Sequence, residues 1–178
     1  EDSVQTYSGL TQAEFENLGS SYNPFKNDRF EAQRTGLSIT HDFLITDRTT
    51  LITSVYYSKF DRDWWRQAST SQDGQCAALN PSRLAGVVID PDSCNSIQGR
   101  LRSYETWGIE QRITVTHSLG EFQAGARIHF EEQNRRQING TSPTARSGTL
   151  AENNLRNTSA YSGFMANRFE IGKLSITP

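Results

Sequence analysis

The chain of 178 residues is long enough for one domain with a sizeable core, yet only 34% of its residues are apolar. Its net charge of −2 gives no support to a polyanionic partner such as nucleic acid. No run approaches the ~18 apolar residues of a membrane-spanning helix, and no signal peptide opens the chain. Such a composition fits either a loosely packed soluble domain or a barrel wall with one face of each strand in water.

The first half of the chain contains two long segments with the alternation of β-strands, preceded by the end of another strand at Thr6–Leu10. In Arg29–Phe43 one face carries the apolar residues and a histidine: Leu37, Ile39, His41 and Phe43. In Thr50–Trp65 the apolar face is formed by Leu51, Val55 and Tyr57. The opposite, polar face of this second segment is interrupted by Ile52, Tyr56 and Phe60. Both segments are therefore expected to be strands, although the second alternates less regularly.

The alternation is clearest in the next two segments. In Arg102–Ser118 one face carries Trp107, Ile109, Ile113, Val115 and His117. In Glu121–Arg135 one face carries Phe122, Ala124, Ala126, Ile128 and Phe130. A period of two over this length predicts strands with one apolar and one polar face. A fifth strand is expected at Asn157–Phe169, with no assignment of its faces, and Lys173–Pro178 begins a further one.

The connections between these segments have two very different lengths. Short turns lie at Thr46–Arg48, Leu119–Gly120 and Gly172–Lys173. Long polar loops lie at Thr11–Asp28, Gln67–Arg100 and Ile138–Asn154, and they alternate strictly with the short turns. Outer-membrane barrels have tight periplasmic turns and extended extracellular loops, and strands longer than those of most globular proteins. We therefore expect an all-β fold, in which antiparallel up-and-down strands form an arc of a transmembrane β-barrel.

Cys76 and Cys94 both lie in the longest loop. An oxidising cell-surface environment favours a disulfide between them, which the loop-entropy model values at ~3 kcal/mol. A metal site is the alternative, but the loop has no histidine and two cysteines supply half a site at best. Two unpaired thiols are the remaining alternative. No nucleophile–base constellation, phosphate loop or paired-carboxylate motif suggests catalysis.

Several segments together resemble the barrel of TonB-dependent receptors, especially the ferric dicitrate receptor type. Asp2–Thr11 (DSVQTYSGLT) and Tyr22–Arg34 (YNPFKNDRFEAQR) resemble a strand end that leads through a loop into the next strand. Val55–Trp65 (VYYSKFDRDWW) is similar to the Y-x-x-x-F-x-R-x-W strand of the family. Phe164–Pro178 (FMANRFEIGKLSITP) looks like the hairpin that continues into G-x-R-Y-E. The order of these motifs covers essentially the whole chain.

The resemblance implies an outer-membrane receptor of a Gram-negative bacterium that imports a ferric siderophore or ferric citrate. Such receptors have a 22-stranded barrel, an N-terminal plug domain and a box that contacts TonB. The implied partners are the chelate, outer-membrane lipid, the receptor's own plug and the TonB complex. No covalent chemistry and no cofactor are implied, so the protein is expected not to be an enzyme. Because no plug or box is present, residues 1–178 are expected to be an internal part of the barrel domain.

The alternation also selects residues that would face a ligand. With the polar face as the lumen, Arg62, Arg102 and Arg135 point inward on successive strands, above a ~25 Å apolar band, with Trp64 on the same face. Such a ring suits an anionic chelate, because guanidinium groups bind carboxylate oxygens well. The alternative is that these arginines pair with nearby carboxylates, as charges at a rim usually do. Lower on the same face, salt bridges to a plug are expected from Glu110, Arg112, Arg127 and His129.

Two other classes of protein remain as alternatives. A small complete membrane barrel with an adhesive or structural role would need at least eight strands and closure. A soluble all-β binding module would have shorter strands and long loops at both ends of the sheet. Neither expectation matches the pattern of this sequence as well as the receptor wall does.

Overall fold

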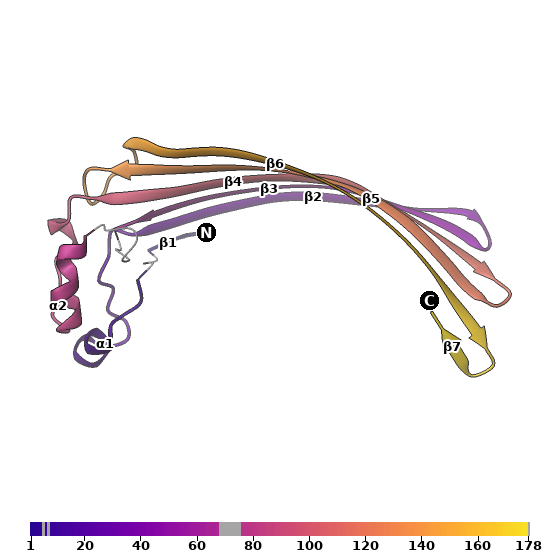
Figure 1. Ribbon diagram of the computed structural model, residues 1–178, viewed down its shortest axis with the longest axis horizontal. Coiled ribbons are helices and arrows are strands. Elements are labelled where there is room, and N and C mark those ends of the chain that lie inside the picture. Colours follow the sequence, from indigo (N-terminus) through magenta and orange to yellow (C-terminus); the bar gives the residue numbers. More distant parts are fainter. Residues whose placement is uncertain (5, 7, 68–75, 178) are drawn as a thin grey trace. The chain divides into compact units, whose positions relative to one another are not determined.

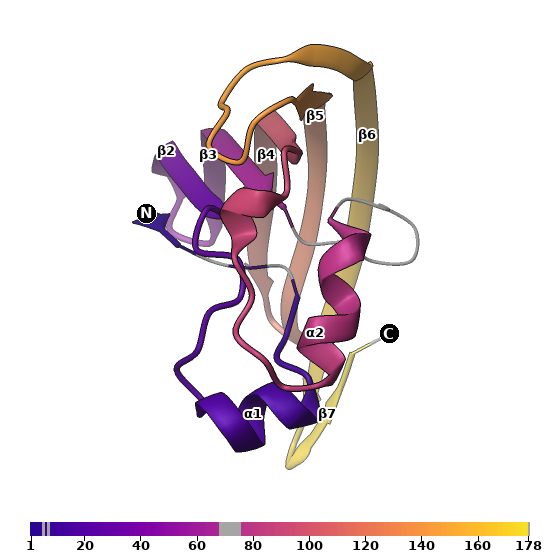
Figure 2. The same ribbon diagram turned by 90° about the vertical axis from the view of Figure 1, so that its left-hand side faces the viewer.

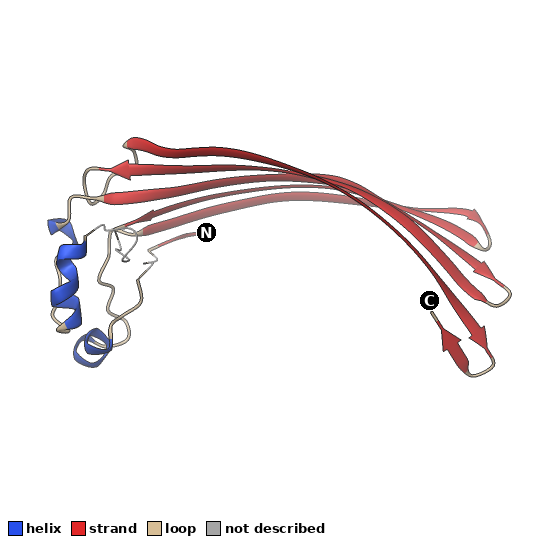
Figure 3. Cartoon of the chain, in the orientation of Figure 1, coloured by secondary structure: helices blue, strands red, loops and turns tan. Residues whose placement is uncertain are grey.

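The computed structural model describes residues 1–4, 6, 8–67 and 76–177, and strands dominate it (Figures 1 and 3). The strands are β1 (Asp2–Ser3), β2 (Arg29–Thr46), β3 (Thr49–Arg66), β4 (Ile97–His117), β5 (Gly120–Gly140), β6 (Thr149–Ile171) and β7 (Leu174–Ile176). They form one sheet in which each strand pairs with its neighbours in the sequence. The sheet is an antiparallel up-and-down arrangement, and the predicted fold class is confirmed. Within the described residues, β1 and β7 are the edge strands of this sheet, each paired on one side.

The five long strands each have between 18 and 23 residues. Strands in globular proteins usually have 3–10 residues, whereas ~9–11 residues already cross a bilayer. Short turns join β2 to β3, β4 to β5 and β6 to β7, and longer segments make the other three connections. The strands are thus long enough to cross a membrane and to extend beyond it.

Several boundaries differ from those expected from the sequence. The strand end predicted at Thr6–Leu10 is wrong, because the pairing with β2 occurs at Asp2 and Ser3 and the described residues of 6–10 are not in a strand. The Gly9 carbonyl instead accepts a hydrogen bond from Arg83 Nη2 at 2.7 Å, which joins this segment to a loop. β4 and β6 begin earlier than predicted, so the second and third loops are shorter than expected.

The longest loops contain short helices. α1 (Gln12–Leu18) lies between β1 and β2, and η1 (Ala77–Leu79), α2 (Asn80–Leu84) and η2 (Pro91–Ser93) lie between β3 and β4. Figure 2 shows α1 and α2 next to each other. In the described residues, no helix has the length and apolar character needed to cross a membrane.

The chain divides into two compact units. The first unit, which we call the loop unit, comprises residues 1–33, 60–103 and 134–155. The second, which we call the turn unit, comprises residues 34–59, 104–133 and 156–178. The loop unit contains two small buried clusters, one around Phe25 and one around Trp65. Most of the large apolar side chains of the turn unit are exposed, so its described residues form no comparable interior.

The turn between β4 and β5 is held by a side chain as well as by the backbone. His117 Nδ1 accepts a hydrogen bond from the Leu119 N–H at 3.2 Å, so the neutral ring carries its proton on Nε2. The Nε2–H group donates to Asn167 Oδ1 on β6, with Nε2 and Oδ1 2.9 Å apart. Gly120 has a φ of 144°, which other residues adopt with strain, and a Cβ there would overlap the Arg168 carbonyl. His117 therefore links the turn between β4 and β5 to β6.

Candidate functional site: two faces of the wall and the packed loops

One face of the turn unit is apolar and aromatic. Trp107 of β4 stacks on Phe130 of β5 with ring centroids 4.3 Å apart, and Phe130 meets Tyr161 of β6 edge-on at 6.3 Å. Trp107 is 50% exposed and Tyr161 is 69% exposed. Contiguous apolar surface of this kind marks an interaction surface for lipid or protein. The predicted apolar faces of Arg102–Ser118 and Glu121–Arg135 thus share one side of the sheet.

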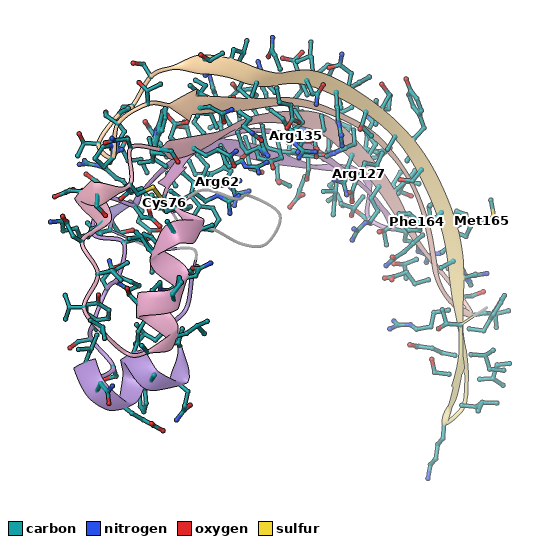
Figure 4. All side chains as sticks on the ribbon, turned by 60° about the vertical axis from the view of Figure 1, so that its left-hand side comes forward. Arg62, Cys76, Arg127, Arg135, Phe164 and Met165 are labelled. Carbon is teal, nitrogen blue, oxygen red and sulfur yellow. A yellow bond between two sulfur atoms is a disulfide. The ribbon has the colours of Figure 1, made fainter. Side chains whose placement is uncertain are left out.

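The structure assigns the two faces of β6, which the sequence left open. Tyr161 lies with the aromatic face, and Met165 leaves the strand on the side opposite to Phe164 (Figure 4). Phe164 lies under the guanidinium of Arg112, whose carbon is 5.8 Å from the ring centroid. Odd-numbered residues of this part of β6 therefore face the apolar side, and even-numbered residues face the polar side.

The polar side of the turn unit carries a hydrogen-bonded cluster of three residues, which we call the inner cluster: Tyr56, Arg127 and His129. The Tyr56 hydroxyl accepts hydrogen bonds from Arg127 Nε at 3.0 Å and Arg127 Nη2 at 2.8 Å. The same hydroxyl lies 2.7 Å from His129 Nδ1. Tyr56, which interrupts the predicted polar pattern of its strand, therefore belongs on the polar face through its hydroxyl group.

Glycines make room for the large side chains of this face. A Cβ at Gly108 of β4 would overlap the Tyr56 hydroxyl, and a Cβ at Gly125 of β5 would overlap the ring of Phe164. The end of each aromatic side chain therefore lies over a glycine of the adjacent strand. The sequence contained a usable signal for this packing, because both glycines fall on the polar face of an alternating strand.

The four residues expected to meet a plug do not all share one environment. Arg127 and His129 belong to the inner cluster, and a cavity of about 240 Å³ is lined by Arg127, His129, Ala160 and Ser162. Arg112 instead pairs with Glu110, with Nη2 and Oε1 3.2 Å apart, and covers Phe164. Glu110 and Arg112 thus neutralise each other, whereas Arg127 and His129 line a cavity.

The predicted ligand-binding residues lie in the loop unit. Arg62 is 6.0 Å from the ring centroid of Trp64, and Arg66 approaches the same ring at 5.5 Å. Trp64 also meets Phe30 of β2 edge-on at 6.1 Å. Arg62 and Trp64 are therefore brought together on one face of β3, as their spacing in the sequence predicts.

Arg102 and Arg135 are placed differently from each other. Arg102 is only 8% exposed, and its Nη1 donates to the carbonyls of Leu101 at 3.1 Å and Arg136 at 3.4 Å. Arg135 is half-buried on β5 (Figure 4, which also labels Arg62). Arg102 thus contributes to local packing, whereas Arg62 and Arg135 keep more contact with solvent.

Two hollows lie near these arginines. A small one of about 60 Å³ is lined by Asp61, Asp63, Leu101, Arg102, Ser103, Asn134 and Arg136. A larger one of about 440 Å³ is lined by Glu1, Asp2, Glu31, Ala32, Gln33, Asp61, Arg62 and Asp63. Carboxylates and guanidinium groups share both linings, so Arg62, Arg102 and Arg136 each have carboxylates nearby.

The first and second long loops pack against each other through a buried ion pair. Arg83 donates to Glu14 through Nε at 2.8 Å and Nη2 at 2.9 Å, with Glu14 fully buried. Glu14 also completes the capping box of α1, because its carboxylate accepts from the Thr11 N–H while its own N–H donates to the Thr11 hydroxyl. Burial acts to raise the pKa of Glu14, but the hydrogen bonds from Arg83 and Thr11 outweigh it and hold that pKa below 4.5.

A second set of contacts fixes the base of these loops. Cys76 and Cys94 form a disulfide beside the buried ring of Phe25. Gln67 is fully buried, and its side-chain amide donates to the carbonyls of Pro91 and Cys94. Its backbone N–H donates to Asp28 Oδ1. The disulfide and the side-chain bonds of Gln67 therefore fix the second loop, and the bond from the Gln67 N–H to Asp28 joins it to the first.

The third loop contacts the same region. The guanidinium carbon of Arg146 lies 5.8 Å from the Trp65 ring centroid, and Arg146 Nη2 donates to the Asn27 carbonyl at 3.0 Å. Trp65 is 4% exposed and packs with Ile97 and Leu101. The three loops thus form one packed assembly instead of three independent segments.

Sequence reasoning did not identify Tyr56 as a member of the inner cluster, or Gly108 as the glycine beneath it. It also did not identify the ion pair between Glu14 and Arg83. Tyr56 could be found from its position on a polar face opposite a glycine, whereas the ion pair has no sequence signal because its partners belong to different loops. In the part of the chain that the structure describes, no group of three or more His, Cys, Asp or Glu side chains could hold a metal ion.

Comparison with solved structures gives a likeness in fold. No family model matches the chain, and no curated protein matches it. The chain is similar to the crystal structure of the ferric citrate transporter FecA in the unliganded form, with a TM-score of 0.71 and 18% sequence identity. The superposition covers 95% of this chain and 23% of that transporter. At this identity the likeness shows a shared fold, namely antiparallel strands of the same barrel architecture.

Proposed function

We propose that residues 1–178 form part of the barrel wall of an outer-membrane receptor of the TonB-dependent type. The complete receptor binds a ferric chelate, either a siderophore or ferric citrate, and imports it with energy relayed through TonB. The receptor's plug domain, the TonB complex and outer-membrane lipid are its partners. The chain carries out no covalent chemistry in this role.

The observation that carries the proposal is the match of nearly the whole chain to the FecA structure at a TM-score of 0.71. The strands, at 18 to 23 residues, have the length that a membrane wall requires. The aromatic face formed by Trp107, Phe130 and Tyr161 suits contact with lipid. The opposite face, with Arg127 and His129, suits a water-filled lumen.

Arg62 and Arg135 are the residues that we propose for contact with an anionic chelate. Arg62 lines the hollow of about 440 Å³ and keeps its guanidinium beside Trp64. Trp64 supplies an aromatic face that can pack against an aromatic or planar chelate. Arg102, whose guanidinium donates to two backbone carbonyls, supports the strand that lies between them.

Transport of radioactive ferric citrate and of a ferric catecholate chelate tests the proposal. The complete receptor is expressed in Gram-negative cells that lack their own uptake systems for both chelates, with and without a functional TonB. We expect accumulation of one chelate that requires TonB. Accumulation of neither chelate, or accumulation that is the same without TonB, would contradict the proposed function.

The contribution of the arginines is tested by replacing Arg62 and Arg135 together with alanine. Uptake is expected to fall about tenfold or more at low chelate concentration, because charge-assisted hydrogen bonds of ~1.5–3 kcal/mol each are lost. Arg48→Ala, a loss of one positive charge at the turn between β2 and β3, is the control and should leave uptake unchanged. Unchanged uptake in the double variant removes both arginines from the site.

A further inference from the structure

We propose that Arg127, His129 and Ser162 form a carboxylate-binding site on the polar face of β5 and β6. The inference rests on the proposed function, because it takes this face as the lumen of a receptor. It concerns a site separate from Arg62 and Arg135, since it belongs to the turn unit and they belong to the loop unit. The carboxylate can come from a soluble polycarboxylate or from a side chain of the same receptor.

The guanidinium of Arg127 is held in place and retains free donors. Its Nε and Nη2 both donate to the Tyr56 hydroxyl, at 3.0 Å and 2.8 Å. Its carbon also lies 5.3 Å from the Tyr56 ring centroid. These contacts use one edge of the guanidinium fork and leave the N–H groups of Nη1 for another acceptor. Arg127 is therefore positioned in advance for a ligand.

The positive charge of Arg127 is not balanced within the residues that the structure describes. Its hydrogen-bonding partners there are Tyr56 and His129, neither of which is a carboxylate. Two other arginines of the same unit have carboxylate partners: Arg112 pairs with Glu110, and Arg168 pairs with Glu170, each at 3.2 Å. Arg127 thus keeps its full electrostatic attraction for an external anion.

His129 adds a second donor whose direction is fixed by its tautomer. Arg127 Nη2 lies 3.3 Å from His129 Nδ1, and a guanidinium can only donate, so Nδ1 acts as an acceptor. The Tyr56 hydroxyl, which already accepts from Arg127, gives its own proton to the same Nδ1. The neutral ring therefore carries its proton on Nε2, where it can donate to a ligand.

The residues that carry these donors line a cavity. Arg127, His129, Ala160 and Ser162 line a space of about 240 Å³, which exceeds the ~30 Å³ share of one water molecule severalfold. Ala160 leaves room because its side chain is small, and Ser162 contributes a hydroxyl donor. A guanidinium, an imidazole N–H and a hydroxyl around one hollow are donors for which a carboxylate is the matching acceptor.

Arginine-specific modification of the complete receptor in detergent tests the proposal. The receptor is treated with phenylglyoxal at increasing concentrations of citrate, and modification of Arg127 is measured by mass spectrometry of the peptides. A second sample is first treated with a carbodiimide and glycinamide, which convert accessible carboxylates to amides. Arg168, on the same face but paired with Glu170, is the internal reference whose modification citrate should not change.

Two results support the site and distinguish the source of the carboxylate. Arg127 that reacts without citrate and is protected by citrate indicates a soluble ligand. Arg127 that is protected without citrate, and becomes reactive after amidation, indicates a carboxylate of the receptor itself. Arg127 that reacts equally with and without citrate, or that is protected without citrate and stays protected after amidation, overturns the proposal. The uptake of radioactive ferric chelate by the same receptor is measured in parallel, so failure of the site is distinguishable from failure of the proposed function.

Tyr56→Phe provides a variant that removes one hydroxyl and keeps the ring over Gly108. If Tyr56 positions Arg127, the citrate concentration that gives half-protection should rise about tenfold, because hydrogen bonds to a charged group are lost. In a receptor that supplies its own carboxylate, the same variant should become reactive without amidation. A variant that behaves as the wild type in both arms contradicts the role of the inner cluster.

Discussion

The carboxylate of Glu14 and the guanidinium of Arg83 form a bidentate ion pair across two loops, with Nε–Oε1 and Nη2–Oε2 distances of 2.8 Å and 2.9 Å. Glu14 is fully buried, so Arg83→Met would leave a buried carboxylate without its partner. We expect a loss of ~3–5 kcal/mol in the stability of the packed loops. Limited proteolysis of the complete receptor should then cut within the loop between β3 and β4 much faster than in the wild type.

A matched control separates this effect from a simple loss of charge. Lys26 pairs with Asp92 at 3.1 Å, but both side chains are more than half exposed. Lys26→Met should therefore change the cutting rate little, since exposed ion pairs contribute ~0–1 kcal/mol. Equal rates for the two variants would show that the pair between Glu14 and Arg83 does not hold the loops.

The same pair should make the loops sensitive to acid. The pKa of Glu14 is lowered in the folded state, because the hydrogen bonds from Arg83 and Thr11 outweigh the effect of burial. The stabilisation is thus fully present above the ordinary pKa of 4.5 and is lost as the pH falls through the lowered value. Hydrogen exchange of the loop peptides, corrected for the intrinsic rate, should show the loss, and Glu14→Gln should abolish the pH dependence.

Reduction of the disulfide between Cys76 and Cys94 should loosen the loops and leave the strands in place. The bond closes a loop with a sequence separation of 18, for which the loop-entropy model gives ~3 kcal/mol. We expect faster proteolysis around Phe25 and no change in the far-ultraviolet circular dichroism of the strands. Loss of the β-sheet signal on reduction would show that the loops are required for the wall.

The alternation of long and short connections was sufficient to predict the fold class from the sequence, because loop length reports which end of a strand a connection leaves. Strand ends were predicted less well. The first strand pairs at Asp2 and Ser3, since Arg83 binds the Gly9 carbonyl and draws that segment into the loops. Such a tertiary contact joins residues far apart in the sequence, so periodicity cannot reveal it.

The aromatic side of the turn unit should not tolerate charge. Phe130 lies between Trp107 and Tyr161, and on a lipid-facing surface an arginine costs ~2–4 kcal/mol near the bilayer midplane. Phe130→Arg should lower the urea concentration at which the receptor unfolds in lipid vesicles. Ser162→Arg introduces the same residue on the polar side and is expected to cost less. A larger loss for Ser162→Arg would reverse the assignment of the faces.

The glycine beneath Tyr56 should be required for the inner cluster. A Cβ at Gly108 would overlap the Tyr56 hydroxyl, so Gly108→Ala should displace the tyrosine and break its bonds to Arg127. We expect a destabilisation of about 1–3 kcal/mol, as for other substitutions that overfill a packed site. Gly163→Ala is the control, because the nearest atom to a Cβ there is the Gly125 carbonyl oxygen at 3.5 Å.

The candidate site, like the strand ends, could be predicted from the sequence only in part. The period of two placed Arg62 with Trp64 and placed Arg127 with His129, because residues two apart share a face of a strand. It could not show that Arg102 turns its guanidinium toward backbone carbonyls. Nor could it show that Arg112 is neutralised by Glu110 while Arg127 has no carboxylate within ion-pair distance in the described part of the chain.

Accessibility of spin labels along β5 tests the membrane wall most directly. Both cysteines of the chain are in the disulfide, so single cysteines can be introduced at successive positions from Gln123 to Phe130 in the complete receptor, reconstituted in lipid vesicles. Labels at 124, 126, 128 and 130 should be accessible to oxygen dissolved in lipid, and labels at 123, 125, 127 and 129 to a water-soluble nickel complex. Uniform access of the nickel complex to all eight positions would contradict a membrane-spanning wall.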